Sequence, residues 1–322
     1  WAYESTGIRE LQDSGLDGSG IHVCMVDTGI DASHPDFSNL TLTGFRDFYE
    51  DEHDLVRDVG EDSHGTMMAG LLVADGKLRG AAPGVDLSVA LALGPSGTSG
   101  QEDRVAQAIR WCRITQKADI VSLSLGSEPG DGMGIQSETT LAVQEALDAG
   151  IFVVAAAGNT GDDPDISDVS VPANLPGVIA VGASTRSGSV WSNSADGSLD
   201  NPYGDGNRSY PDQKPEVTAP GVLLFSTTTT LIEPPYAYST GTSDSTVLVT
   251  GALALILELH GAALAGDDGV IDSEGMGIVK RALASSCDKT GIDGSPHDTR
   301  GGYGMLDAVQ WASDIAFELN LA

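Results

Sequence analysis

The stretch GTSDSTVLVTGALALILELH, residues 241–260, begins with a glycine and two hydroxyl residues and continues as an almost wholly apolar run. The run is too long for a strand and is rich in alanine and leucine, so it predicts a buried helix. Either Thr242 or Ser243 then lies at the helix start, where free backbone N–H groups carry partial positive charge and hold anions. A serine there can attack a carbonyl whose oxyanion the same backbone stabilises, although serine and threonine are also ordinary helix caps.

The length and composition of the chain predict a large hydrophobic core. The chain has 322 residues, 40% of them hydrophobic, and it shows no internal repeat or linker, so we expect one domain covering residues 1–322. The longest apolar run, in 247–257, is broken by Thr250 and Gly251, and we expect no membrane span. The chain opens with Trp1 and shows no signal peptide, which we interpret as a processed or trimmed form.

The charge of the chain is strongly one-sided, with 47 acidic residues, 16 basic residues and a net charge of −31. The acids are scattered and lysines number only five, so the phosphate backbone of nucleic acid would be repelled. Salt screens the self-repulsion of such a surface, and we therefore expect a protein that works in concentrated salt. An acidic protein from a moderate environment is the alternative.

The three cysteines, Cys24, Cys112 and Cys287, form no metal-binding or CxxC pattern. Cys24 lies in an apolar run and is expected to be a small buried hydrophobic residue. One disulfide bridge stays possible, but the fold does not depend on a disulfide framework.

Strands and helices alternate along most of the chain. Apolar runs of strand length lie at 21–26, 85–93, 118–126, 151–157 and 178–183, and helical patterns lie at 5–14, 62–74, 102–117, 137–148, 274–285 and 305–317. Residues 222–240 suggest an extended hairpin. Because the strands are almost wholly apolar, we predict a three-layer α/β fold with a mostly parallel central sheet and helices on both faces.

Three further polar residues stand out beside the serine. Asp27 ends the first strand, at the sheet edge where open α/β folds bind ligands. His64 falls in the first turn of the helix at 62–74, which Asp62 or Ser63 is expected to cap, and Asn159 follows the fourth strand. Taken singly, these are also ordinary turn or surface residues.

Together, Asp27-Thr-Gly, His64-Gly-Thr, Ala155-Ala-Ala-Gly-Asn159 and Gly241-Thr-Ser243 resemble the subtilisin-like serine proteases, which carry Asp, His and Ser in this order. Further segments resemble the family too, from about residue 5 to 315, and the acidic charge is similar to that of extracellular subtilases of halophiles. The resemblance implies a serine endopeptidase in which Asp27 orients His64, His64 activates Ser243, and the Asn159 side chain helps hold the oxyanion.

The resemblance also implies how substrate binds. Polypeptide substrates would lie extended between the segments Ser122–Gly126 and 96–100, with a first specificity pocket walled by 124–126 and 156–158. The expected substrate-binding residues are Ser122, Leu123, Ser124, Leu125, Gly126, Ala156, Ala157, Gly158, Ser99 and Gly100. An N-terminal propeptide that aids folding and inhibits the enzyme is the other implied partner, and the implied location is outside the cell or at its surface.

The sequence departs from the family beside the nucleophile, where Asp244 replaces an apolar residue. We expect Asp244 to be an ordinary acid at the positive helix end, turned to solvent, so that Asp244→Asn alters the rate little. The departure also supports an alternative function, a weakly active or inactive subtilase-like scaffold subunit of a larger assembly. The chemistry requires no cofactor or metal; a structural calcium ion is possible, with Asp36 or the loops 161–168 and 193–207 as oxygen ligands, but it is not assigned.

Overall fold

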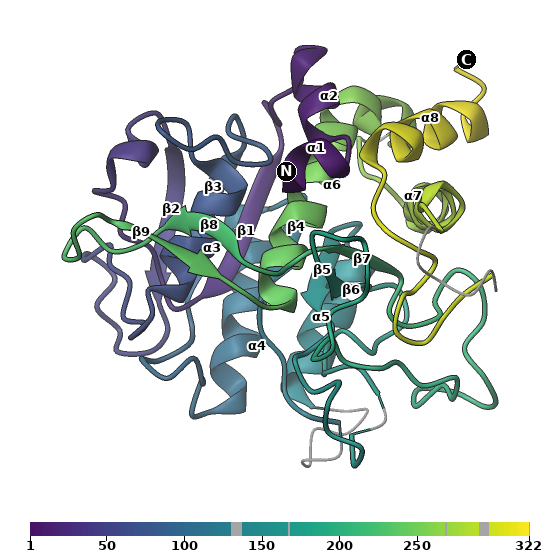
Figure 1. Cartoon of the computed structure of the whole chain (residues 1–322), viewed down its shortest axis with the longest axis horizontal. Helices are drawn as coiled ribbons and strands as arrows, with labels where there is room; N and C mark the ends of the chain where they lie inside the picture. The colour runs from purple at the N-terminus through teal and green to yellow at the C-terminus, as the bar shows by residue number, and fades with distance from the viewer. Residues whose placement is uncertain (130–136, 167, 268, 290–295, 322) are drawn as a thin grey trace.

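A parallel sheet of seven strands forms the centre of the protein in the computed structural model, which describes residues 1–129, 137–166, 168–267, 269–289 and 296–321 (Figure 1). The strands stand in the order β2-β3-β1-β4-β5-β6-β7. They are β1 (His22–Asp27), β2 (Thr41–Asp47), β3 (Asp86–Leu91), β4 (Ile120–Leu123), β5 (Phe152–Ala156), β6 (Ile179–Ser184) and β7 (Val217–Pro220).

The sheet buries its middle strands on both faces. From β3 to β6 nearly every strand residue is buried, which is why these strands read as continuous apolar runs and not as alternating patterns. All five strands expected from those runs are present, and every pairing in this sheet is parallel. The predicted α/β class is therefore confirmed.

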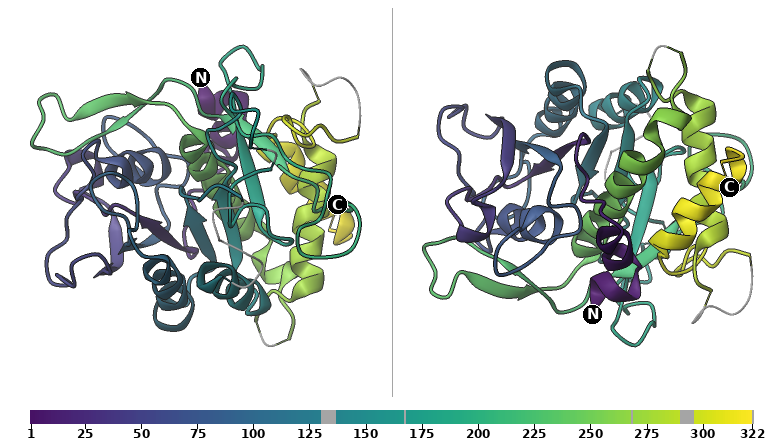
Figure 2. Two further views of the ribbon diagram at one scale, coloured as in Figure 1. Left: turned by 90° about the horizontal axis from the view of Figure 1, so that it is seen from below. Right: turned by 90° about the horizontal axis from the view of Figure 1, so that it is seen from above.

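Helices cover both faces of the sheet, as the two views in Figure 2 show. On one face, α6 (Thr242–Leu264) packs against β4 to β7 and is flanked by α3 (His64–Val73). On the other face lie α4 (Glu102–Trp111) and α5 (Glu138–Asp148), which pack against each other. The remaining helices, α1 (Ala2–Ser5), α2 (Ile8–Asp13), α7 (Ser273–Ser286) and α8 (Ala308–Glu318), lie near the chain ends.

The helix α6 is the predicted buried helix, although its length alone would allow it to cross a membrane. It has 23 residues, and by length and mean hydropathy alone it passes for a membrane span. In the fold, however, 72% of its most apolar 18-residue window is buried inside the protein. It therefore serves as a core helix here.

Three local differences separate the structure from the expectations. The strand β2 was not predicted, because its exposed edge residues alternate with half-buried ones and its sequence TLTGFRD is mostly polar. The helix expected over 5–14 is split into α1 and α2 at Gly7, whose φ of 74° lies in the left-handed region. The helix expected over 102–117 ends at Trp111 and continues as a π-helical turn, Cys112–Gln116. The predicted hairpin is present as β8 (Leu224–Thr227) and β9 (Tyr236–Ser239).

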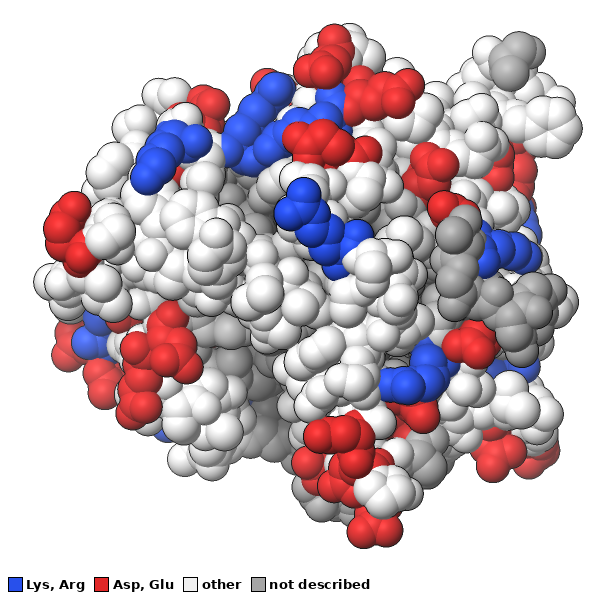
Figure 3. All heavy atoms as spheres, in the orientation of Figure 1, with Lys and Arg blue, Asp and Glu red and all other residues white. Residues whose placement is uncertain are grey.

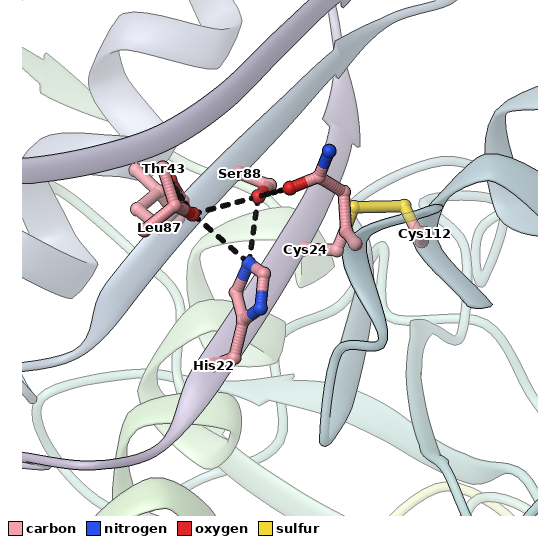
Figure 4. The surroundings of a disulfide bond; sticks show 7 residues. His22, Cys24, Thr43, Leu87, Ser88 and Cys112 are labelled. Carbon is pink, nitrogen blue, oxygen red and sulfur yellow. Dashed lines mark hydrogen bonds between the residues drawn. A yellow bond between two sulfur atoms is a disulfide. The ribbon is translucent and has the colours of Figure 1, made fainter. Parts of the chain in front are cut away.

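A disulfide bond joins Cys24 of β1 to Cys112 at the end of α4 (Figure 4). Cys287 is a buried free thiol. Cys24 is fully buried, as expected, but it is a bridging residue and not merely a small apolar one. Polar side chains lie beside the bridge: Ser88 Oγ is 2.6 Å from His22 Nε2 and donates to Gln116 Oε1 at 2.8 Å. Because it joins Cys24 to Cys112, the disulfide bond fixes the end of α4 to β1, the strand that ends at Asp27.

Removing this disulfide is expected to destabilise the protein considerably. The bond closes a loop with a sequence separation of 88 residues. By loop-closure entropy its loss costs about 4 kcal/mol, which corresponds to a fall in Tm on the order of 10 °C. The measurement is thermal unfolding of a Cys24→Ala/Cys112→Ala variant, with Cys287→Ala as the control that deletes a buried thiol but keeps the bridge. Equal shifts in the two variants would contradict the prediction.

Two of the five lysines are buried in one ionic cluster between β7 and α7. Lys214 Nζ donates to Glu216 Oε1 at 2.8 Å, and Lys280 Nζ donates to the same oxygen at 2.7 Å and to Asp212. Both ammonium groups also donate to the backbone carbonyl of Val178. The two ammonium groups and two carboxylates of the cluster balance each other, so the net negative charge of the chain comes from other residues. On the face shown in Figure 3, the acidic side chains lie in scattered groups.

Candidate active site

The four predicted site residues come from separate segments that meet at the carboxyl edge of the sheet. Asp27 is the last residue of β1, and Asn159 follows β5 by three positions. His64 is the first residue of α3, and Ser243 is the second residue of α6. This edge is where open α/β sheets place their ligands.

The Asp27 carboxylate orients the His64 imidazole. Oδ1 of Asp27 lies 2.7 Å from Nδ1 of His64 and also accepts the backbone N–H of Thr28 at 2.7 Å. Burial of the imidazole opposes its charge, but the charge and hydrogen bond of Asp27, together with the charges of Asp244 and Asp58, raise the pKa of His64 to about 9. The Nδ1 contact leaves Nε2 as the nitrogen that can accept a proton.

The Ser243 hydroxyl is nearly buried and points at the neighbouring strand end. Its Oγ donates to the backbone carbonyl of Ser124 at 3.2 Å, and Ser124 Oγ returns a bond to the carbonyl of Ser243 at 3.2 Å. Within the described part of the chain, no hydrogen bond joins Ser243 Oγ to His64. Contacts between a nucleophile and its base are often loose before substrate binds.

The Asn159 side chain is held in one orientation by Thr242. Its Oδ1 accepts both the backbone N–H and the Oγ1 hydroxyl of Thr242, each at 2.9 Å. A backbone N–H can only donate, so the amide oxygen must face it and Nδ2 is left free to donate elsewhere. As the second helical residue, Ser243 also has a backbone N–H without a partner inside the helix. Two donors thus lie beside the hydroxyl.

A cavity of about 420 Å³ adjoins Ser243 and Asn159. Six of the ten residues expected to bind substrate line it: Ser99, Ser124, Leu125, Gly126, Ala156 and Gly158. Ser122, Leu123 and Ala157 are fully buried, so they support the wall without lining the cavity, and the exposed Gly100 does not line it either. Ser170 and Glu128 also line the cavity, and no local signal in the sequence identified them.

Asp244 is buried, which corrects the expectation that it faces solvent. Its side chain lies under β9, where Ser239 Oγ donates to its Oδ2 at 2.9 Å, and only 1% of the residue is exposed. Its Oδ1 has no hydrogen-bond partner among the described residues. Burial raises the pKa of Asp244 to about 7, against the opposing effects of the Ser239 hydrogen bond and the His64 charge. No local pattern indicated this burial, because β9 covers the helix start only in the folded chain.

The substitution Asp244→Asn is therefore expected to change the pH dependence of activity, contrary to the small effect expected from sequence. An ionised Asp244 stabilises the charged form of His64, whereas an imidazole must be neutral to act as a general base. The acid limb of kcat/KM should lie near pH 9 in the parent and fall by about 0.5–1 unit in the variant, so that activity at pH 7 rises about 3- to 10-fold. Superimposable pH profiles of parent and variant would contradict the prediction.

Asp58 is a further residue of the site that the sequence analysis missed. Its carboxylate accepts hydrogen bonds from Thr28, next to Asp27, and from Thr66, two residues after His64. Asp58 lies six positions before His64, and no motif connects them. The contact exists only because the segment 57–60 folds back along the end of β1.

The described residues among those considered as calcium ligands form no shared site. Asp36 accepts the backbone N–H groups of Lys77 and Leu78 at 2.8 and 2.9 Å and the Tyr236 hydroxyl at 3.1 Å. These donors engage both carboxylate oxygens. Among the described residues, no group of three or more His, Cys, Asp or Glu side chains is arranged to hold a metal ion.

Comparison with known proteins places the chain in a family. The model of the Subtilase family matches residues 18–304. Subtilisin E of Bacillus subtilis (strain 168) is 35% identical over 253 residues, which cover 78% of this chain and 58% of that protein. The major intracellular serine protease of the same organism is 35% identical over 256 residues, which cover 77% of this chain and 71% of that protein.

Solved structures support the fold. The structure of the prenylagaramide maturation protease PagA superimposes with a TM-score of 0.73 at 22% identity, over 96% of this chain and 98% of that one. The chain spans less than two thirds of the length of subtilisin E. From the match to the family model and the identity to curated members, we conclude that the chain belongs to the subtilase family.

Proposed function

We propose that the chain is a serine endopeptidase that hydrolyses peptide bonds through Asp27, His64 and Ser243, with Asn159 assisting at the oxyanion. The observation that carries the proposal is the fixed Asn159 amide beside the start of α6. Thr242 holds its oxygen, so its free N–H₂ group and the Ser243 backbone N–H form a pair of donors next to a hydroxyl. That arrangement suits a tetrahedral oxyanion.

The proposed reaction has two halves, formation and hydrolysis of an acyl-enzyme, and the same groups act in both. The Ser243 hydroxyl turns from the Ser124 carbonyl to Nε2 of His64, loses its proton there and attacks the scissile carbonyl. The imidazolium, stabilised by Asp27, then protonates the leaving amine. Water hydrolyses the acyl-enzyme by the same steps in reverse, with His64 again as the base.

A fluorophosphonate probe tests this proposal, because it reacts with activated serine hydroxyls. We expect one adduct, located on Ser243 by peptide mass spectrometry, and faster labelling at pH 9 than at pH 6 because His64 must be neutral. Folded protein that stays unlabelled between pH 6 and 10, in dilute and in molar salt, would instead favour an inactive scaffold subunit. The buried Asp244 charge beside the nucleophile is the observation that keeps this second function in view.

We infer that substrates are polypeptides bound in extended form along the strand end 124–126 and the segment 97–99, which line one cavity. A propeptide that occupies the same cleft before maturation is the second proposed partner. We also propose an extracellular or cell-surface location, supported by the disulfide, since such bonds persist in oxidising compartments. No metal or cofactor takes part in the proposed chemistry.

The proposed working environment is concentrated salt, supported by the net charge of −31. Counterions relieve the repulsion between the surface carboxylates, so the thermal midpoint should rise substantially between dilute buffer and molar KCl. Sucrose of equal osmotic strength is the control and should stabilise less. A midpoint that does not depend on salt would contradict the high-salt proposal without affecting the proposed chemistry.

A further inference from the structure

The segment 57–60 forms a short strap across the end of β1. The backbone N–H of Ile30 donates to the carbonyl of Arg57 at 3.0 Å, and the N–H of Val59 donates to the carbonyl of Thr28 at 3.0 Å. Gly29 and Asp58 form an antiparallel bridge between these bonds. The strap thus holds Asp58 directly beside the residues that follow Asp27.

The Asp58 carboxylate connects this strand end to the first turn of α3. Its Oδ1 accepts the Thr28 hydroxyl at 2.7 Å and the backbone N–H of Gly60 at 2.8 Å. Its Oδ2 accepts the backbone N–H and the hydroxyl of Thr66 at 2.8 and 2.6 Å. Thr28 Oγ1 in turn accepts the backbone N–H of Gly65 at 2.9 Å.

These bonds replace the cap that α3 lacks. The N-cap residue Ser63 is in the left-handed region, with φ of 55°, and its side chain makes no capping hydrogen bond. Helix N–H groups at the first turn have no partner inside the helix and are usually satisfied by the N-cap side chain. Here Thr28 and Asp58 accept the N–H groups of Gly65 and Thr66 from outside the helix.

The packing around the strap leaves no space for the turn to shift toward β1. A Cβ on Gly65 would lie 2.1 Å from the carbonyl oxygen of Gly29, and a Cβ on Gly29 would lie 2.0 Å from that of Arg57. The helix start and the strand end are therefore in backbone contact. Their relative position depends on the hydrogen bonds that hold them together.

From this geometry we propose that Asp58 is a positioning residue of the peptidase site, which fixes the first turn of α3 against the end of β1 so that His64 stays in contact with Asp27. The inference rests on the proposed function, because it concerns the same reaction. Asp58 touches neither the nucleophile nor the imidazole, so it acts through Thr28 and the helix start.

The charge of Asp58 adds a second effect on His64. The acidic groups that act on the imidazole are Asp27 from β1, Asp58 from the strap and Asp244 from α6, and each favours the charged form. An imidazolium forms in the transition state, so a fixed negative charge nearby stabilises it. Loss of that charge should also move the acid limb of the pH profile to lower pH.

The substitution Asp58→Asn tests the proposal, because it keeps the volume but replaces one acceptor oxygen with a donor group. We expect kcat to fall about tenfold or more while KM changes less than about twofold, and the acid limb of kcat/KM to move to lower pH. The matched control is Asp62→Asn, which removes an exposed charge two residues from His64 and should leave kcat, KM and the limb unchanged.

A second pair of variants covers the case in which Asp58→Asn does not fold. Thr28→Val removes the hydroxyl that joins Asp58 to Gly65 but keeps every charge, so kcat should fall several-fold with the acid limb in place. Thr28→Ser retains the hydroxyl and should restore the rate. Parent-like kcat in both Asp58→Asn and Thr28→Val would overturn the inference. A parent protein that is itself inactive and unlabelled by the probe would overturn the proposed function instead.

Discussion

Replacing Ser243 with alanine is expected to lower kcat by about 10⁶-fold and to abolish fluorophosphonate labelling. Removal of the nucleophile in subtilisin, a relative of this chain, has an effect of about this size. In this chain, the Ser243 hydroxyl lies at the start of α6 beside the Asn159 amide, and it is the group proposed to form the acyl bond. The remaining activity would come from the oxyanion donors and from substrate binding.

The structure of the site should survive this change. Within the described residues, Ser243 Oγ donates only to the carbonyl of Ser124, and the bond that Ser124 returns goes to the Ser243 backbone, which alanine retains. Binding of a peptide inhibitor and the Tm should therefore stay close to those of the parent. The measurement is kcat by active-site-normalised peptide hydrolysis. A variant that keeps more than about a hundredth of the parent rate would show that another group is the nucleophile.

Replacing Asn159 with alanine is expected to lower kcat by about 10²–10³-fold with little change in KM, since the lost donor acts on the oxyanion and not on the bound substrate. This is the size of effect known for the oxyanion-hole asparagine of subtilisin. Steady-state kinetics on a peptide substrate at pH 10, where His64 is neutral, isolates the effect from changes in protonation.

A matched variant separates catalysis from structure at this position. Asn159 also accepts two hydrogen bonds from Thr242, so alanine removes a structural contact as well as the donor. Asn159→Asp has the same shape and keeps the acceptor for Thr242, but it lacks the N–H₂ group. We expect Asn159→Asp to be at least as slow as Asn159→Ala. Recovery of the parent rate in Asn159→Asp would mean that the residue serves only to hold Thr242.

The parts of the fold that could be predicted were those with a local signal. Strands buried on both faces, such as β5, are continuous apolar runs, and α6 is too long for a strand. The edge strand β2 carries no such run, because one side of it faces solvent. It is held in the sheet by its pairing with β3. The break at Gly7 follows from tertiary contact, since a Cβ there would lie 2.9 Å from Val309.

The candidate site likewise contains residues that a local sequence pattern indicates and residues that it does not. Asp27, His64, Asn159 and Ser243 were identified because each lies in a short motif at the end of a predicted element. The burial of Asp244 was missed because the contact that covers it comes from Ser239 in the hairpin, whose docking no local pattern indicates. Local sequence therefore indicated the four residues of the proposed reaction, whereas the residues that surround them could be identified only in the folded chain.

The buried lysine cluster affects how the protein responds to amine-reactive reagents. Lys77, Lys117 and Lys289 are exposed, whereas Lys214 and Lys280 lie inside the fold. Burial lowers the pKa of Lys214 to about 8, so much of this amine would be unprotonated in mildly alkaline solution, but no reagent can reach it. An acylating ester applied to the native protein will therefore mark the side chains of the three exposed lysines. Acylation of the two interior lysines, followed over time by mass spectrometry, would then report how often α7 separates from the sheet.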